Sequence, residues 1–370
     1  MLDHLRFLQE NSRLLLSLEE SQKVGSVLGN VSNFVCEDIP VRDIEPYTGR
    51  LRPLLADLGL FRKWKELCCK EHKGICDAPA DMAGFSLRLI DVQRRLIVTE
   101  CRNVSFVALS YVWGTNTKPC LTQSTKSAFQ REGSLNENSL PATIYDAIKV
   151  TLALGERYLW VDSCCIVQDD EQDKLKYVPR MDLIYGLASV TIVATSGISA
   201  EAGLPGVKQG SRSRVQEPFT VKGIQLIETL DPNGNGEVGS YVGESVWNER
   251  GWTFQERLLS RRALVFTDEQ VYWECEKALW SEDSHREFTS VPMIYRHTID
   301  DEFPRQPLNA DTAEFERLYR ILVEKYSGRH FKNEEDYLNG FAGILQNFKR
   351  LYNEDFVWGL PESLFSSALT

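Results

Sequence analysis

The feature that most constrains the fold is an alternation of strand-like and helix-like segments between residues 105 and 197. Three short apolar runs have strand composition: SFVALSYVWG, RYLWVDSCCIV and SVTIVATS. Between them, LPATIYDAIKVTLALG and RMDLIYGLA have helical periodicity, with Pro141 suited to a first turn and Gly155 to a helix end. A β-α-β-α-β order builds a parallel sheet with helices on both faces. We therefore expect an α/β fold in which the three runs are neighbours in a mainly parallel sheet.

The flanking segments predict further elements. Helical spacing in LDHLRFLQENSRLLLSLEES and in RPLLADLGLFRKWKELCCKEH predicts an N-terminal helical region, residues 1–80. FSLRLIDVQRRLIVTEC predicts two strands with a turn at Gln93–Arg95, and RALVFTDEQVYWECE predicts a hairpin that turns at Thr267–Gln270. Helical periodicity returns near the end of the chain. The chain therefore divides into that region, an α/β core at residues 81–290 and a C-terminal helical extension at residues 291–370.

The residues that follow the predicted strands are candidates for ligand binding, because ligands of open parallel sheets bind beyond the carboxyl ends of the strands. The first strand leads into Ser110, Tyr111, Trp113 and Gly114, and the second leads into Asp162. A glycine at such a place either lets a ligand approach the backbone or makes a tight turn. The aspartate can bond a ribose hydroxyl, or it can cap the following turn, which we favour slightly.

A fourth stretch, NERGWTFQERLLSRR, places an acid beside an aromatic ring and between two cations. Glu256 follows Trp252 by four residues, and Arg250 and Arg257 flank the pair. The residues alone favour a structural role, in which the glutamate forms an ion pair and the tryptophan packs in the core. The alternative is that Glu256 belongs to a functional site, because acids with strongly perturbed pKa values in clefts mark such sites.

Composition excludes several classes of protein. The formal net charge is -11, with 53 acidic and 42 basic residues, so the chain is a poor general binder of nucleic acid. The Gly/Asn stretch DPNGNGEVGSYVG lacks the spacing of a phosphate-binding loop and is interpreted as a flexible insertion. The first 20 residues carry charges throughout, unlike a signal peptide, and no apolar run approaches the roughly 18 residues of a membrane span.

The cysteines point to a reducing compartment. They number nine, and two pairs are adjacent in sequence, where a bridge is strained. CCKEHKGIC gathers Cys68, Cys69, His72 and Cys76, of which a Cys-x2-His-x3-Cys set can hold zinc. A fourth ligand is missing unless both adjacent cysteines bind, so we favour a reduced, helix-packed cluster without metal. The expected location of the protein is cytoplasmic.

Several of these stretches, taken in order, resemble the fungal heterokaryon incompatibility (HET) domain. The similar blocks include VALSYVWG, LPATIYDAIKVTLALGERYLWVDSCCIVQDD, RMDLIYGLASVTIVATS and NERGWTFQERLLSRRALVFTDEQVYWEC. The resemblance implies a function in self/nonself recognition, in which such domains trigger cell death. HET domains are in turn distantly similar to Toll/interleukin-receptor (TIR) domains, which have a flavodoxin-like fold. In TIR domains that cleave NAD, a motif of type W-C-x-x-E-L carries the catalytic glutamate. The matching W-T-F-Q-E-R here assigns that role to Glu256.

The resemblance implies a chemistry that requires no metal or other cofactor, with NAD as substrate. Loss of neutral nicotinamide leaves an oxocarbenium-like ribose, and a carboxylate such as that of Glu256 can stabilise this charge. Trp113 or Trp252 can stack on a ring of the ligand, and Arg250 or Arg257 can bind the pyrophosphate.

Two functions remain open. One is an NAD glycohydrolase that becomes active when it self-associates or meets an incompatibility partner. The other is a non-enzymatic death-signalling module that acts through homotypic assembly, with Glu256 in a structural role.

Overall fold

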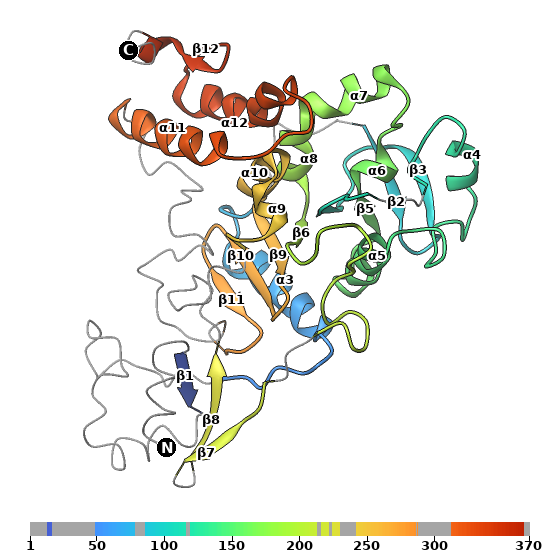
Figure 1. The fold of residues 1–370 in the computed structure, drawn as a ribbon, viewed down its shortest axis with the longest axis vertical. Helices are drawn as coiled ribbons and strands as arrows, with labels where there is room; N and C mark the ends of the chain where they lie inside the picture. The colour runs from blue at the N-terminus through green and yellow to red at the C-terminus, as the bar shows by residue number, and fades with distance from the viewer. Residues whose placement is uncertain are drawn as a thin grey trace.

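The computed structural model describes residues 13–16, 49–77, 86–115, 119–212, 216–221, 224–229, 242–285, 287 and 312–365. Within these residues, one sheet of eight strands forms the centre of the molecule (Figure 1). The spatial order of its strands is β11-β10-β9-β6-β4-β5-β2-β3. The strands are β2 (Leu87–Asp91), β3 (Leu96–Cys101), β4 (Val107–Ser110), β5 (Tyr158–Trp160), β6 (Val190–Ala194), β9 (Arg262–Phe266), β10 (Val271–Cys275) and β11 (Leu279–Ser281).

The four central strands of this sheet are parallel. β4 pairs with β5 on one side and with β6 on the other, and β6 pairs with β9. The three apolar runs are therefore neighbours, which confirms the expected α/β fold. When β4, β5, β6 and β9 are numbered 1 to 4 along the chain, their spatial order in the sheet is 2-1-3-4. This order begins a doubly wound sheet, whose topological switch point lies between strands 1 and 3. In this protein the switch point lies between β4 and β6.

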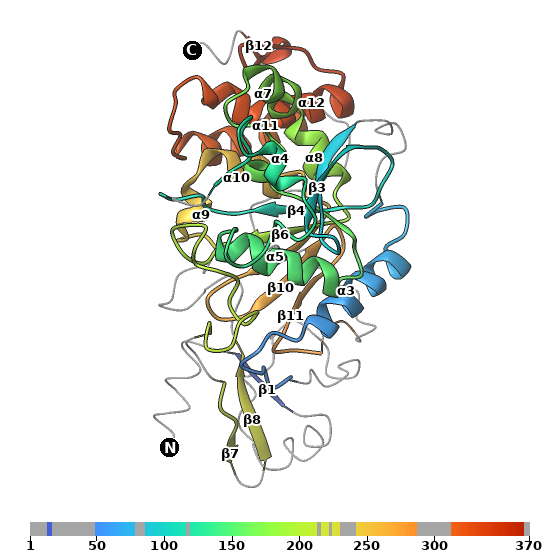
Figure 2. The same ribbon diagram turned by 90° about the vertical axis from the view of Figure 1, so that its right-hand side faces the viewer.

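Helices cover both faces of the sheet. α5 (Ala142–Ala153) connects β4 to β5, and α8 (Met181–Leu187) precedes β6. Because right-handed crossovers that lead to opposite sides of β4 place their helices on opposite faces, α5 and α8 lie on different faces. α3 (Leu58–Glu71) contacts α5, and α10 (Gly251–Leu258) contacts α8 (Figure 2). The shorter helices are α4 (Lys126–Phe129), α6 (Asp162–Cys165), α7 (Glu171–Tyr177), the 3-10 turn η3 (Val178–Arg180) and α9 (Val246–Glu249).

Antiparallel strands extend the sheet at both edges. β2 and β3 form a hairpin beside β5, and β10 pairs with β9 and β11. The Asp91 carboxylate accepts the backbone N–H of Gln93 and of Arg94, both at 3.1 Å, and so stabilises the β2–β3 turn. The turn between β9 and β10 is closed by Thr267, whose N–H donates to the Gln270 carbonyl at 3.1 Å. Both predicted hairpins and their turns are confirmed.

The prediction for the N-terminal region is only partly correct. α3 confirms its second helix, but Arg13–Leu16, expected to be helical, form strand β1. β1 pairs antiparallel with β8 (Ile224–Thr229), which also pairs with β7 (Phe219–Val221). A ladder of backbone hydrogen bonds to β8 outweighs the weak helical preference of four residues. The rest of the first predicted helix lies outside the described residues, as does most of the Gly/Asn stretch.

Two long helices lie near the end of the chain, in the segment expected to form a C-terminal helical extension. They are α11 (Thr312–Ser327) and α12 (Asp336–Tyr352), followed by a short hairpin of β12 (Phe356–Val357) and β13 (Leu360–Pro361). Their buried aromatic and aliphatic side chains form a second cluster with Phe254 of α10. The extension thus packs against the helix that carries Glu256. Among the described helices, none is both long enough and apolar enough to cross a bilayer.

The loop between α11 and α12 holds the start of α10. The Gly251 N–H donates to the His330 carbonyl at 3.0 Å, and the His330 N–H donates to the Glu249 carbonyl at 2.7 Å. Arg329 donates to the Arg250 carbonyl at 3.2 Å. Phe331 lies so close that an ideal Cβ on Gly251 would be 1.7 Å from its Cζ atom. A glycine is therefore required at this contact.

We predict that Gly251→Ala destabilises the protein by about 1–3 kcal/mol, the usual range for overpacking. Chemical denaturation measures the effect. Gly328→Ala is the matched control, because a Cβ there meets no atom within 4 Å. In a Phe331→Leu background the Gly251→Ala penalty should shrink, since the smaller side chain can move away. An equal penalty in both backgrounds would show that this contact is not the cause.

Candidate functional site

Two strand ends and one helix meet at the carboxyl edge of the sheet, beside its switch point. β4 ends at Ser110, and β5 leads through Val161 into α6, which starts at Asp162. α10 contacts β4 and carries Glu256 to the end of that strand. The structure thus brings Ser110, Asp162 and Glu256, predicted from distant parts of the sequence, to the same edge of the sheet.

A chain of hydrogen bonds connects Trp247, Ser110 and Glu256. The indole Nε1 of Trp247 donates to the Ser110 hydroxyl oxygen at 2.8 Å, and that hydroxyl donates to Glu256 Oε2. Because the indole is only a donor, it orients the hydroxyl so that its hydrogen is directed at the carboxyl group. All three side chains are buried, and Glu256 is 6% exposed.

Burial changes the acidity of Glu256. It raises the pKa of this carboxyl from 4.5 to about 7, opposed by hydrogen bonds from Ser110 and Tyr185, while the charge of Asp162 raises it further. In the described part of the chain, no Lys, Arg or His lies within 4 Å ion-pair distance of Glu256. The carboxyl group is therefore held near the midpoint of its titration at neutral pH, without a paired cation.

Asp162 is a second acid with a raised pKa at this edge. Its Oδ2 atom accepts the indole N–H of Trp113 at 2.8 Å, and its Oδ1 atom accepts the Ser163 backbone N–H at 2.6 Å. Burial raises the pKa of Asp162 to about 6, although both hydrogen bonds oppose the shift. Asp162 and Trp113 remain half-buried, so this side of the cluster is closer to solvent than Glu256.

Arg250 supplies a positive charge to the same edge. Its Nη1 atom donates to the Tyr111 carbonyl at 2.7 Å, and the Tyr111 hydroxyl hydrogen-bonds to Ser163 at 2.8 Å. The charge of Arg250 lowers the pKa of both Asp162 and Glu256. Arg250 as a residue is half-buried, and its guanidinium makes no second side-chain hydrogen bond to any described residue, so donors remain for a ligand.

The structure does not bring three predicted residues into this cluster. Gly114 adopts φ +63, and a Cβ there would lie 2.4 Å from the Ser199 Cβ, so the glycine accommodates a loop of the same chain. Trp252 packs edge-on against Phe331, with ring centroids 6.3 Å apart. Arg257 is buried 3.6 Å from Glu274 of β10. The structural ion pair of this stretch therefore belongs to Arg257 and not to Glu256.

Sequence reasoning missed Trp247 and Tyr185. Both side chains are fully buried, and Tyr185 also donates to the Leu109 carbonyl at 3.2 Å. A signal existed for Tyr185, because a buried tyrosine on the apolar face of a helix needs a partner for its hydroxyl. Trp247 follows a loop of irregular composition, and no period in the sequence indicates its partner.

The predicted cysteine and histidine cluster lies apart from the carboxyl groups and comes together only in part. Cys68, His72 and Cys76 lie close to one another, whereas Cys69 is exposed and outside the group. Cys275 of β10, which is distant in sequence from the CCKEHKGIC stretch, joins the other three.

We predict that stability falls as pH rises through neutrality, because the raised pKa of Glu256 favours its neutral form in the fold. The stabilising effect is complete below about pH 4.5 and is lost as pH rises through about 7. Glu256→Gln cannot ionise, so it should be more stable than the parent at pH 8, by about 3 kcal/mol at most, and close to it at pH 5. Melting temperatures across this range measure the difference, with Glu249→Gln, an exposed glutamate, as control. A parent–variant difference that is independent of pH would contradict the assignment.

Comparison with known proteins identifies the region that holds this cluster. Residues 106–256 match the family model of the heterokaryon incompatibility protein (HET). Searches of curated proteins and of solved structures gave no match. The matched segment begins just before β4 and ends at Glu256, so it contains the whole hydrogen-bonded cluster. A HET domain indicates a role in heterokaryon incompatibility and the associated cell death. The chain therefore contains a domain of the heterokaryon incompatibility family, located at residues 106–256.

Proposed function

We propose that this HET domain is a cell-death effector that hydrolyses NAD to nicotinamide and ADP-ribose, with Glu256 as the catalytic residue. One observation carries the proposal: the Glu256 carboxyl group, which has no paired cation among the described residues, lies at the carboxyl edge of the sheet, beside its switch point, with a pKa of about 7. Acids with such perturbed pKa values concentrate at functional sites. W-T-F-Q-E-R has the same Trp-to-Glu spacing as the glutamate motif of NAD-cleaving TIR domains, with Thr253 in place of its cysteine, and this resemblance supports the same residue.

The chemistry suits a single carboxylate. The bond between the ribose C1′ and the nicotinamide nitrogen breaks, and its electron pair leaves with the nicotinamide, which becomes neutral. The ribose becomes oxocarbenium-like, and Glu256 stabilises that charge. Water then adds to C1′ and loses a proton, which the Glu256 carboxylate accepts and passes to solvent. The hydrolysis therefore requires no oxidant, reductant or metal.

The raised pKa is compatible with this role. A free carboxylate in the apolar interior is unfavourable, so the empty site holds the acid close to half-protonated at neutral pH. The nicotinamide ring of NAD carries a positive charge, and an opposite charge within a few ångströms lowers the pKa of a carboxyl group. Substrate binding therefore produces the ionised form that catalysis needs.

Arg250 is the best candidate to bind the pyrophosphate. Its Nη1 atom donates to the Tyr111 carbonyl, which fixes the side chain, and the residue as a whole is half-buried. Guanidinium groups bind phosphate oxygens through charge-assisted hydrogen bonds. Trp113 lies on the more accessible side with Asp162 and offers a face for a ring.

Self-association is the proposed activating step. Glu256 is 6% exposed, so NAD cannot reach it without movement of the surrounding elements. Assembly with a second copy, or with an incompatibility partner, supplies a reason for such movement. A single chain should then have low activity that increases with protein concentration.

The hydrogen bonds of Glu256 also support a second, non-enzymatic function. Among the described residues, the hydrogen-bond partners of the Glu256 carboxyl group are Ser110 and Tyr185. Both belong to the chain itself, as in the structural networks of buried polar groups. In that case the domain signals death through protein contacts alone, and Glu256 orders α10 against β4.

We predict that Glu256→Gln reduces NAD cleavage by roughly a hundredfold or more, the effect of a positioned acid–base group. Release of nicotinamide from NAD is measured on concentrated, purified protein. Glu249→Gln, the same substitution at an exposed site seven positions earlier, should cleave NAD like the parent. Parental activity in Glu256→Gln would exclude the assignment. If no version cleaves NAD and only Glu256→Gln loses toxicity on expression, the non-enzymatic function is correct.

A further inference from the structure

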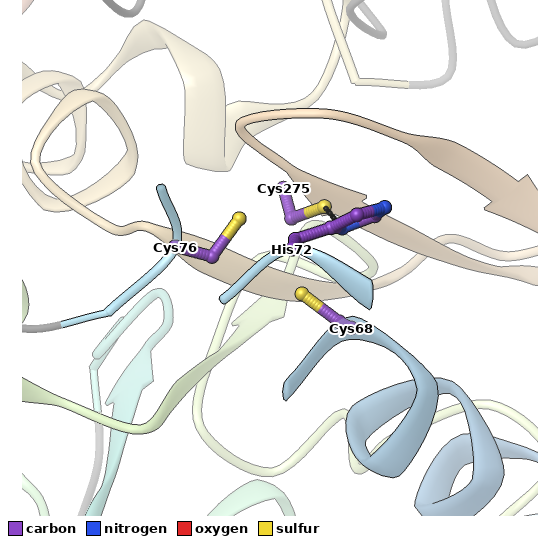
Figure 3. Close-up of side chains that lie close together, drawn as sticks. All are labelled: Cys68, His72, Cys76 and Cys275. Carbon is purple, nitrogen blue, oxygen red and sulfur yellow. Dashed lines mark hydrogen bonds between the residues drawn. The ribbon is translucent and has the colours of Figure 1, made fainter. Parts of the chain in front are cut away.

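Four potential metal ligands from two distant parts of the chain converge beside β10. They are Cys68, His72, Cys76 and Cys275, and one ligand atom from each lies within 4.8 Å of all the others (Figure 3). The Cys275 sulfur is 3.4 Å from His72 Nδ1. Ligand atoms bonded tetrahedrally to one Zn²⁺ at usual bond lengths are roughly 3.5–3.8 Å apart, so small side-chain movements suffice.

The local backbone explains why Cys68, His72 and Cys76 lie close together. Cys68 lies in the last turn of α3 and His72 caps the helix, so the i, i+4 spacing puts both on the same face. The chain then turns back, with the Cys76 N–H donating to the His72 carbonyl at 3.1 Å and Gly74 at φ +82. Cys69 is one position farther along the helix, and its side chain is exposed.

Two arginine side chains lie beside the cluster. Arg262 Nε donates to the Cys68 sulfur at 3.3 Å, and Arg261 donates to the Cys76 carbonyl at 3.2 Å. Three thiolates and one Zn²⁺ carry a net charge of about -1, which these guanidinium groups offset. The hydrogen bond to sulfur also orients a ligand in the way that outer-shell partners of metal sites do.

We propose that Cys68, His72, Cys76 and Cys275 form a structural Cys₃His zinc site. Four protein ligands close the tetrahedron and leave no position for substrate, so the site stabilises the fold and is not catalytic. The metal would fasten the end of α3 to β10, next to β9. Because β9 directly follows α10, the zinc would also fix the base of the helix that carries Glu256.

The proposal differs from the zinc set suggested by the sequence alone. That set uses Cys69 and lies within nine residues, so even an unfolded peptide could bind metal through it. The set in the structure replaces Cys69 with Cys275, about 200 positions away, and exists only in the folded chain. Metal content of suitable variants separates the two.

The experiment measures zinc bound to the purified full-length protein by elemental mass spectrometry. We expect about one zinc per chain in the parent and in Cys69→Ser, and at least about tenfold less in Cys275→Ser and Cys68→Ser. His72→Cys should retain the metal, because four thiolates also bind zinc well. Co²⁺ substituted into the parent should give the visible absorption bands of a tetrahedral thiolate site, and a strong chelator should lower the melting temperature.

Three results would overturn the proposal. The first is a well-folded parent protein that contains no zinc and whose melting temperature does not change when a chelator or Zn²⁺ is added. The second is loss of zinc in Cys69→Ser with retention in Cys275→Ser, which identifies the local sequence set. The third is a disulfide between two of the three cysteines in protein alkylated under denaturing conditions. The measurements on the parent keep the test valid even where a variant fails to fold.

Discussion

The hydrogen bond between Ser110 and Glu256 is the constraint on which the rest of the domain depends. It joins the last residue of β4, the first parallel strand, to α10, which enters the fold some 140 residues later. A buried carboxyl group without a cation is tolerated only if its oxygens are hydrogen-bonded. The bond therefore also fixes Trp247, which orients the Ser110 hydroxyl, and with it the position of α9.

The C-terminal extension holds the same helix from the outside. Arg329 donates to Asn248 at 2.8 Å and to the Arg250 carbonyl at 3.2 Å, and Phe331 fills the space left by the missing side chain of Gly251. The residues that match the HET family end at Glu256, before these supports begin. The extension is thus structurally part of the site, and any partner that moves it must also move α10.

Local patterns in the sequence predicted much of the fold, because strands, helices and tight turns depend on neighbouring residues. The parallel order of the three apolar runs, α3, α5 and both hairpins followed from periodicity and turn residues. What periodicity could not supply was pairing between distant segments. Arg13–Leu16 became a strand because β8 offered a partner, and Arg257 paired with Glu274 on a strand that comes later in the chain. Cys275 joined the cysteine cluster for the same reason.

The charge state of the site connects its structural and chemical roles. As neutral acids, Glu256 and Asp162 are ordinary members of a buried hydrogen-bonded network, and the fold is most stable in this form. As carboxylates they repel each other, and the positive charge of Arg250 opposes that repulsion. Because the pKa values are about 7 and about 6, both forms of Glu256 exist near neutral pH. A positively charged ligand would shift this balance toward the carboxylate, whereas a purely structural site gains nothing from ionisation. The proposed chemistry therefore rests on the presence of an acid at this position, where an amide could accept the same hydrogen bonds.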